Sequence, residues 1–453
     1  MALIVWMALL PFVLFVIMNP PDLNRRKFLG ATGAAGATLA VVGFPSIMKG
    51  EETTSNNKVL KIGLIGCGGR GTGAASQALS ADPNVKLWAM GDAFAPAITN
   101  SLNSLTKFAD RVEVPEGRRF VGLDAFQKVL ESGVDVVLLA SPPGFRPQHL
   151  RAAVEAGKHI FAEKPMAVDV AGVKSVMESA KLAKQKNLAI QHGFCWRYAP
   201  GVREAYGKIT SGELGKVYSV YGTYFGTPPK PLQPGMTKPE GMGDVEWQVK
   251  WWNNFEWLSG SPLLEQAIHS VDKIAWAMGD VAPIAAVAAG GIAMHSHDGN
   301  VYDHYNITYE YPGGILCHMG ERQFPGLFAE VVDRVYCEKG TVICPDNPMV
   351  LGLDGKKRQW MYRPQADVEQ NMYQVCHNEF FASLRKGEIV NSGEYMANST
   401  MLAILGREAA HTGLRITWED LWKAEQDKAP DTLKFADEFP VAPVPVPGKY
   451  KLA

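Results

Sequence analysis

The stretch Val59–Gly71, VLKIGLIGCGGRG, runs from an apolar, strand-like segment into a glycine-rich turn. Gly66 allows a tight turn out of the strand, Gly68 lets the backbone approach a pyrophosphate, and Gly71 lets the next helix pack close to the sheet. The N-terminus of that helix would face the phosphates with free N–H groups. The stretch therefore predicts a dinucleotide-binding loop, in which Cys67 is a small space-filling residue.

An acidic residue follows at the spacing that such a loop requires. A second strand is expected over residues 85–90, and Asp92 comes 21 residues after Gly71 (92 − 71). A carboxylate here would hydrogen-bond the ribose hydroxyls of the adenosine and repel a 2′-phosphate. The pattern favours NAD over NADP; the alternative is a glycine-rich turn that binds no ligand.

Length and composition exclude several classes of protein. The chain has 453 residues and a formal net charge of −1, which suits two or three domains with ample core. It has no long basic stripe, which argues against nucleic acid as the partner. Its cysteines show no C-x-x-C spacing and predict neither a zinc site nor a disulfide framework. They are Cys67, Cys195, Cys317, Cys337, Cys344 and Cys376.

Residues 1–57 are expected to be an export signal and a linker. Asn24–Leu29, NRRKFL, resembles a twin-arginine export motif and precedes a weakly apolar run rich in Ala and Gly. We therefore expect the twin-arginine export machinery to deliver the protein to the periplasm. The alternative is a chance Arg-Arg pair before a buried helix.

The apolar residues before this motif, 1–18, allow two interpretations. They could insert into the membrane and anchor the N-terminus, although 18 residues are short for a span. Translation that starts at Met18 would instead give an ordinary signal, and we favour this interpretation.

From Lys58 onward, strand and helix patterns alternate, which predicts an α/β fold with a parallel sheet covered by helices. The apolar run 134–140 suits a buried parallel strand, and Gly157 suits the end of a helix. We assign residues 58–192 to a Rossmann dinucleotide-binding domain. Further strands are expected over 59–65, 159–162 and 188–192, and helices over 126–132, 149–156 and 170–185.

Beyond residue 193 short β-rich segments and turn glycines dominate, and they predict a second, mostly antiparallel sheet. A helix is expected over 263–278, and late helices over 373–385 and 395–411. We assign 193–425 to an α/β substrate and oligomerisation domain. Residues 426–453 form a Pro- and Lys-rich tail that is expected to wrap over the surface.

Two groups of polar residues suit catalysis. Lys164, in Glu163-Lys164-Pro165, follows a strand at the carboxyl edge of the sheet, where ligands bind. Glu265, His269 and Asp272 have the spacing of one helix face. Asp272 would either hold the imidazole of His269 or cap local backbone. The alternatives are a solvated strand-end lysine and a surface salt-bridge pattern.

Other polar and aromatic residues give weaker signals. Trp252 lies in a cluster before that helix and suggests a carbohydrate substrate, because tryptophan rings stack on sugar faces; ordinary packing is an equal alternative. His304 precedes a strand and is expected to face the cleft. Irregular spacing argues against a metal site, and none is predicted, among His295, His297, Asp298, Asp303 and His304.

Across about residues 58–425 the chain resembles the Gfo/Idh/MocA oxidoreductases, which include glucose–fructose oxidoreductase and inositol 2-dehydrogenase. The resemblance implies a Rossmann domain and an α/β domain whose large, open, mostly antiparallel sheet often forms oligomer contacts. A homo-oligomer, either a dimer or a tetramer, is therefore expected. The matching stretches are Gly66–Gly71, Ser141-Pro142-Pro143 with His149, Ala156–His159, Glu163-Lys164-Pro165, Gly212–Val217 and Glu265–Asp272.

The resemblance also implies roles for individual residues. Lys164 would contact the reacting hydroxyl and the nicotinamide ribose, and His269 would be the general acid/base. Many members carry Asp where this chain has Glu265, whose longer side chain shifts the carboxylate. An arginine near Arg197 often lies close to the cleft. The predicted catalytic residues are Lys164, His269 and Glu265; the predicted NAD-binding residues are Gly66, Cys67, Gly68, Gly69, Arg70, Gly71, Asp92, Ser141, Pro142, His149, Glu163, Lys164 and Arg197; the predicted substrate residues are Trp196, Arg197, Trp252, Asp272 and His304.

These features favour hydride transfer between bound NAD and a secondary alcohol of a sugar, cyclitol or glycoside. His269 would take the hydroxyl proton, and Lys164 would stabilise alkoxide charge. Free NAD is scarce outside the cytoplasm, so an exported enzyme should hold NAD tightly and recycle it with a second substrate. The alternatives are a glycosidase that uses bound NAD for transient oxidation and elimination, and a non-catalytic sugar-binding protein.

Overall fold

The computed structural model describes residues 48–49, 58–294, 298–430 and 432–452. All of them belong to one compact unit, residues 42–453. The predicted export motif and the apolar residues before it lie outside the described residues, as do His295 and His297. No helix in the described part of the chain is long and apolar enough to cross a membrane.

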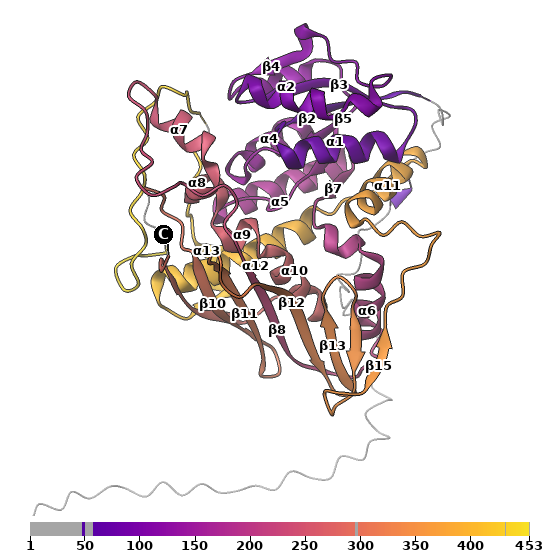
Figure 1. The fold of residues 1–453 in the computed structure, drawn as a ribbon, viewed down its shortest axis with the longest axis vertical. Coiled ribbons are helices and arrows are strands. Elements are labelled where there is room, and N and C mark those ends of the chain that lie inside the picture. The colour runs from indigo at the N-terminus through magenta and orange to yellow at the C-terminus, as the bar shows by residue number, and fades with distance from the viewer. Residues whose placement is uncertain (1–47, 50–57, 295–297, 431, 453) are drawn as a thin grey trace, which may run out of the picture. The chain divides into compact units, whose positions relative to one another are not determined.

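The N-terminal domain is built on a six-stranded sheet whose neighbouring strands are all parallel, in the order β4-β3-β2-β5-β6-β7. Helices connect the strands, so the predicted Rossmann architecture is confirmed (Figure 1). The strands are β2 (Leu60–Ile65), β3 (Val85–Asp92), β4 (Arg119–Val121), β5 (Val136–Leu139), β6 (His159–Ala162) and β7 (Ile190–His192). The helices are α1 (Gly69–Ala81), α2 (Ala95–Ser104), α3 (Ala125–Glu131), α4 (Arg146–Glu155) and α5 (Val170–Gln185).

The second domain contains a nine-stranded sheet, β15-β14-β13-β12-β8-β11-β10-β9-β17. Only β8 and β11 pair in parallel, so the predicted mostly antiparallel sheet is also confirmed. The strands are β8 (Val217–Gly226), β9 (Ala285–Gly291), β10 (His304–Tyr311), β11 (Ile315–Gln323), β12 (Glu330–Cys337), β13 (Gly340–Cys344), β14 (Met349–Leu351), β15 (Arg358–Met361) and β17 (Ile416–Thr417).

The helix α12 (Gly393–Thr412) joins the two domains. It is buried on nearly every face along most of its length, including charged residues such as Arg407 and Glu408. It packs against β9 of the large sheet, against α5 of the Rossmann domain and against α10 (Ile268–Ala277). The interior is therefore continuous between the domains.

A late helix returns to the Rossmann domain, which contiguous domain boundaries do not capture. α11 (Met372–Arg385) packs on α1 and lies beside it in Figure 1. Gln374 Nε2 donates to the Gln77 carbonyl at 3.0 Å, and Arg385 Nε donates to Asp82 at 2.5 Å. Part of the segment assigned to the second domain thus completes the first.

The helix expected over 263–278 is interrupted, and this part of the prediction is wrong. α9 (Pro262–Glu265) ends before α10 begins at Ile268. The carbonyl of Glu265, placed to accept an N–H of the next turn in a continuous helix, accepts the Lys164 ammonium instead. The break sits where the two domains meet, so a tertiary contact replaces a helical hydrogen bond.

Candidate active site

A cavity of about 290 Å³ lies at the C-terminal ends of β2, β3 and β5. Gly66 has φ +91°, and a Cβ on Gly71 would lie 1.9 Å from the Gly66 oxygen, so both positions require glycine. Gly68 and Gly69 have open space where a Cβ would stand. An open, uncapped α1 N-terminus fits a pyrophosphate, because its first N–H groups lack intrahelical partners.

Asp92 connects the strand β3 to the glycine loop. Its Oδ2 accepts from the Cys67 N–H at 2.7 Å, and its Oδ1 accepts from the Phe94 N–H at 2.9 Å. Burial raises the Asp92 pKa, while these backbone hydrogen bonds act in the opposite direction. Each oxygen has a second lone pair, so the carboxylate, which lines the cavity, can still accept from ribose hydroxyls.

His149 contributes a polar atom that is buried beside the cavity. The Nδ1 of His149 lies 3.0 Å from Ser141 Oγ, and the ring stacks on Phe126 at 4.2 Å. Burial and the nearby Arg146 lower the His149 pKa to about 3, so the imidazole is neutral. Its Nε2 has no hydrogen-bond partner among the described residues, which suits a polar group of a bound dinucleotide.

Two arginines hold the loops of this cavity. Arg146, 1% exposed, donates to the carbonyls of Leu139 and Ser141 at 2.6 and 2.7 Å. Arg70 Nε lies 3.1 Å from Glu163 Oε1, and the Arg70 guanidinium lies over the Tyr373 ring. Arg146 and Tyr373 were not predicted; Arg146 is close to the loop in sequence, whereas Tyr373 comes from α11, which only the fold brings there.

Lys164 and Glu265 meet across the domain boundary. Lys164 Nζ donates to the Glu265 carbonyl and lies 3.1 Å from Glu265 Oε1. The other carboxylate oxygen accepts from Gln266 Nε2 at 2.8 Å. Glu265 and Gln266 line a second cavity of about 220 Å³, and the lining of neither cavity includes Lys164. Glu265 is thus the member of the pair that reaches the second cavity.

His269 lies at the start of α10 and is 8% exposed. Burial, the Lys164 charge and the Lys273 charge together hold its pKa well below the ordinary value. The imidazole is therefore neutral at neutral pH and lies within electrostatic range of Lys164. No described residue provides a hydrogen-bond partner for its Nδ1.

Asp272 and Arg197 bind each other instead of lining a cavity. Asp272 is 1% exposed, and it accepts from Arg197 at 3.0 and 3.1 Å, from Tyr395 at 2.8 Å and from Ser399 at 2.8 Å. Arg197 also pairs with Asp280. Because α10 starts after the break, Asp272 does not share the environment of Glu265. This placement argues against the predicted ligand contacts of Asp272 and Arg197.

The remaining substrate predictions have mixed outcomes. Trp252 lines the first cavity, beside the glycine loop, and does not line the second. Trp196 lies under the Lys273 ammonium at 4.5 Å and lines neither. His304 also lines neither cavity, but its Nδ1 lies 2.9 Å from Asp303, which lines the second. Sequence reasoning missed Asp303 as a cavity residue and considered it only as a metal ligand.

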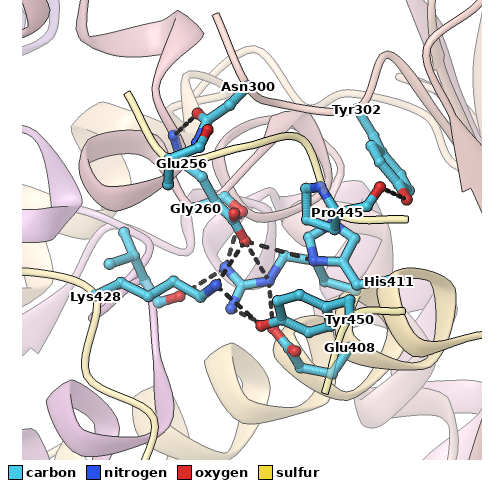
Figure 2. A network of polar contacts seen from close by, with 12 residues as sticks. Glu256, Gly260, Asn300, Tyr302, Glu408, His411, Lys428, Pro445 and Tyr450 are labelled. Carbon is cyan, nitrogen blue, oxygen red and sulfur yellow. Dashed lines mark hydrogen bonds and ion pairs between the residues drawn. The ribbon is translucent and has the colours of Figure 1, made fainter. Parts of the chain in front are cut away.

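One cluster among the described residues, outside both cavities, brings three buried metal-ligating side chains close together: Glu256, Glu408 and His411 (Figure 2). Cations already neutralise this cluster. Arg407 lies 2.7 Å from Glu408 and 3.4 Å from Glu256, and Lys428 lies 3.2 Å from Glu256. Burial lowers the His411 pKa to about 4, so the two carboxylates face two permanent cations. The cluster therefore anchors the C-terminal segment rather than offering a metal site.

Two family models match this chain. The model "Oxidoreductase family, NAD-binding Rossmann fold" matches residues 60–194, and the "GFO/IDH/MocA C-terminal domain" matches residues 202–343. The chain is 24% identical to 4-carboxy-2-hydroxymuconate-6-semialdehyde dehydrogenase of a Sphingobium species, over 65% of this chain and 84% of the relative. It is 24% identical to inositol 2-dehydrogenase of Streptomyces avermitilis, over 63% of this chain and 76% of the relative.

The fold also resembles solved structures. Levoglucosan dehydrogenase in complex with NADH and levoglucosan superposes with a TM-score of 0.63 at 19% identity, covering 79% of this chain and 99% of that one. The family models and the observed pair of domains agree in their order along the chain. The chain therefore belongs to the Gfo/Idh/MocA family of oxidoreductases, and its N-terminal domain is the NAD-binding Rossmann domain of that family.

Proposed function

We propose that this protein transfers a hydride between bound NAD and a secondary alcohol of an uncharged sugar, cyclitol or glycoside. The observation that carries the proposal is the meeting of Lys164 and Glu265 from different domains, with neutral His269 close by and a second cavity adjoining Glu265. The names of the relatives, inositol 2-dehydrogenase and levoglucosan dehydrogenase, support this substrate class.

Each of these residues has a separate role in the reaction. NAD, when bound, supplies the hydride acceptor at its nicotinamide ring. His269 accepts the hydroxyl proton, because its imidazole is neutral and no described hydrogen bond at Nδ1 fixes its tautomer. Lys164 stabilises the negative charge that develops on the substrate oxygen, by roughly a few kcal/mol. The carboxylate and carbonyl of Glu265 fix the position of that ammonium.

The lining of the second cavity favours an uncharged substrate. No Lys or Arg occurs among the described residues that line it, whereas carboxylates and amides that bind hydroxyls are frequent. Such a lining disfavours sugar phosphates and sugar acids. Its polar members are Gln233, Asn253, Asn254, Glu265, Gln266, Tyr302, Asp303 and Gln323.

A substrate screen tests this function. Purified full-length protein is incubated with inositols, anhydrosugars, aldoses, glycosides and the corresponding sugar phosphates, and NADH absorbance and product mass are measured. We expect oxidation of at least one neutral polyol and none of its phosphate. Cleavage of a glycoside without net NADH would instead establish the redox-neutral glycosidase. Sugar binding without chemistry would establish the binding protein.

We also propose that the twin-arginine machinery exports the protein to the periplasm. The support is the sequence NRRKFL at residues 24–29 followed by the Ala- and Gly-rich run. Arg25→Lys combined with Arg26→Lys should retain the protein in the cytoplasm. Unchanged periplasmic recovery of the double variant in cell fractionation would contradict this proposal. N-terminal sequencing of the exported product would locate the start and any cleavage site.

A homo-oligomer is the third proposal, and it rests on the open face of the nine-stranded sheet. Tyr221, Val287 and Leu316 are all more than a third exposed. The strand register places them on one face. His318 pairs with Tyr221 and Thr308, and Thr308 pairs with Val287, so these side chains lie in one row across the sheet. Leu316 precedes His318 by two residues on the same strand and therefore shares its face. Light scattering should give a dimer or tetramer, and Leu316→Asp should reduce its association. A monomer at micromolar concentration would contradict the proposal.

A further inference from the structure

The dinucleotide cavity has a second wall that the Rossmann domain does not provide. Lys230, Val249, Lys250 and Trp252 line the cavity together with the glycine loop. Lys230 follows β8, while the others lie on α7 (Asp244–Lys250) and on the short helix η6 (Trp252–Asn254). We call these four residues the outer wall. A bound dinucleotide would thus lie between two domains.

Aromatic contacts join this part of the second domain to the rim of the Rossmann domain. Phe145 packs edge-on against Trp257 with ring centroids 5.9 Å apart, and Phe94 stacks on Phe435 at 5.4 Å. A Cβ on Gly144 would lie 2.3 Å from the Trp257 oxygen. The two sides are therefore in direct contact, which holds the outer wall against the Rossmann domain.

The C-terminal segment braces the outer wall from behind. Gln248 of α7 donates to the Phe439 carbonyl at 2.5 Å, and the Phe439 N–H donates to Asp244 at 3.0 Å. Earlier in the segment, Lys428 pairs with Glu256 in the buried cluster of Figure 2. The segment thus ties α7 to the interior of the second domain.

Two positive charges meet on the outer wall. Lys230 Nζ donates to the Lys250 carbonyl at 2.9 Å, so the backbone of one lysine holds the ammonium of the other. Burial, and after it the nearby Lys250 charge, lowers the Lys230 pKa. The same cavity contains the N-terminus of α1, which also favours negative charge. Both walls therefore suit phosphate.

We propose that Lys230 and Lys250 bind the pyrophosphate of NAD from the side opposite the glycine loop, and that this second contact retains the nucleotide through successive turnovers. Ammonium groups bind phosphate oxygens through charge-assisted hydrogen bonds. This role concerns retention of the nucleotide and does not depend on the sugar that is oxidised. It would also give an exported enzyme a permanent cofactor.

The test measures nucleotide retention in full-length protein purified from the cytoplasm. Bound NAD(H) is quantified after gel filtration, and its exchange against excess isotope-labelled NAD is followed over time. The double variant Lys230→Ala/Lys250→Ala should exchange NAD at least tenfold faster than the parent. The double variant Lys230→Arg/Lys250→Arg should retain the parent rate, because it keeps both charges.

A matched control removes two lysines elsewhere. Lys128→Ala/Lys423→Ala deletes the same charge from two surface i,i+4 pairs, with Asp124 and Glu419, and should exchange NAD at the parent rate. Exchange by the Lys230/Lys250 alanine variant at the parent rate would overturn the proposal. So would a loss confined to NADP binding, because it would place the lysines at a 2′-phosphate. A protein that retains NAD but oxidises no polyol would leave this proposal intact and refute the proposed function.

Discussion

Two ion pairs bind the same helical segment, one from the Rossmann domain and one from the start of the second domain, and their surroundings differ. In the first, Lys164 and Glu265 have side chains 13% and 17% exposed, and Glu265 lines a cavity. In the second, Asp272 lies seven residues after Glu265 (272 − 265) and accepts from the side chains of Arg197, Tyr395 and Ser399. A carboxylate with saturated partners holds the fold together, whereas one that faces a cavity can act on a ligand.

We call Lys164–Glu265 the open pair and Arg197–Asp272 the sealed pair. The sealed pair should produce the largest effect when it is broken. Asp272→Ala leaves the buried Arg197 charge, Tyr395 and Ser399 without their common acceptor, so we expect a loss of about 3–5 kcal/mol in the free energy of unfolding. Urea denaturation measures this quantity. Glu265→Ala, the matched change in the open pair, should cost about 1 kcal/mol or less. Equal losses from both variants would remove the distinction between the pairs.

The open pair should matter for turnover rather than for stability. Lys164→Ala and His269→Ala should each lower turnover by about 10²-fold or more, because a charge stabiliser or a general base is lost. The Lys164 variant should unfold at nearly the parent urea concentration, and the His269 variant should still bind NAD. Glu265→Gln keeps the carbonyl contact to Lys164 and should have a smaller effect. Near-full turnover by His269→Ala would refute the mechanism.

A third carboxylate combines the two behaviours, because Asp92 holds the glycine loop and also lines the nucleotide cavity. Asp92→Ala should weaken NAD binding by about tenfold, the cost of roughly one charged hydrogen bond, and should admit NADP. Calorimetric titration with both nucleotides measures the change. Unchanged selectivity would mean that the ribose contact lies elsewhere.

Much of the Rossmann domain could be predicted from sequence, because its signals are local. The turn at Gly66 requires a positive φ, Gly71 requires a close helix, and the apolar run before Ser141 forms a fully buried strand. Each requirement is visible in the identity of a few neighbouring residues. The order of strands and helices then follows from their alternation.

Less of the second domain could be predicted from sequence, because the residues that determine its contacts are distant from one another in the chain. The i, i+4, i+7 spacing predicted that Glu265 and Asp272 share one helix face. Instead Lys164, 101 residues away from Glu265, donates a hydrogen bond to the Glu265 carbonyl where the helix breaks. The partners of Asp272 come from Arg197, Tyr395 and Ser399. Lys230 and Lys250 line the nucleotide cavity from a part of the second domain where α7 packs against the C-terminal segment. Periodicity carries no information on such contacts.

The smallest expected effect concerns the pH at which the open site loses activity. Burial and the charges of Lys164 and Lys273 hold the His269 pKa below its ordinary value of about 6.5, so the imidazole stays neutral and able to accept a proton as the pH falls through 6.5. The acid limb of kcat/KM, which reports the free enzyme, should therefore lie below pH 6.5.

Lys164→Met removes one of the two charges and should move the limb of its residual activity upward, towards 6.5. Asp272→Asn, assayed where it remains folded, should leave the limb in place, because the charges that lower the His269 pKa come from Lys164 and Lys273. A limb at 6.5 in the parent, or one that Lys164→Met does not move, would show that His269 does not titrate beside Lys164. His269 and Lys164 would then not act together in one active site.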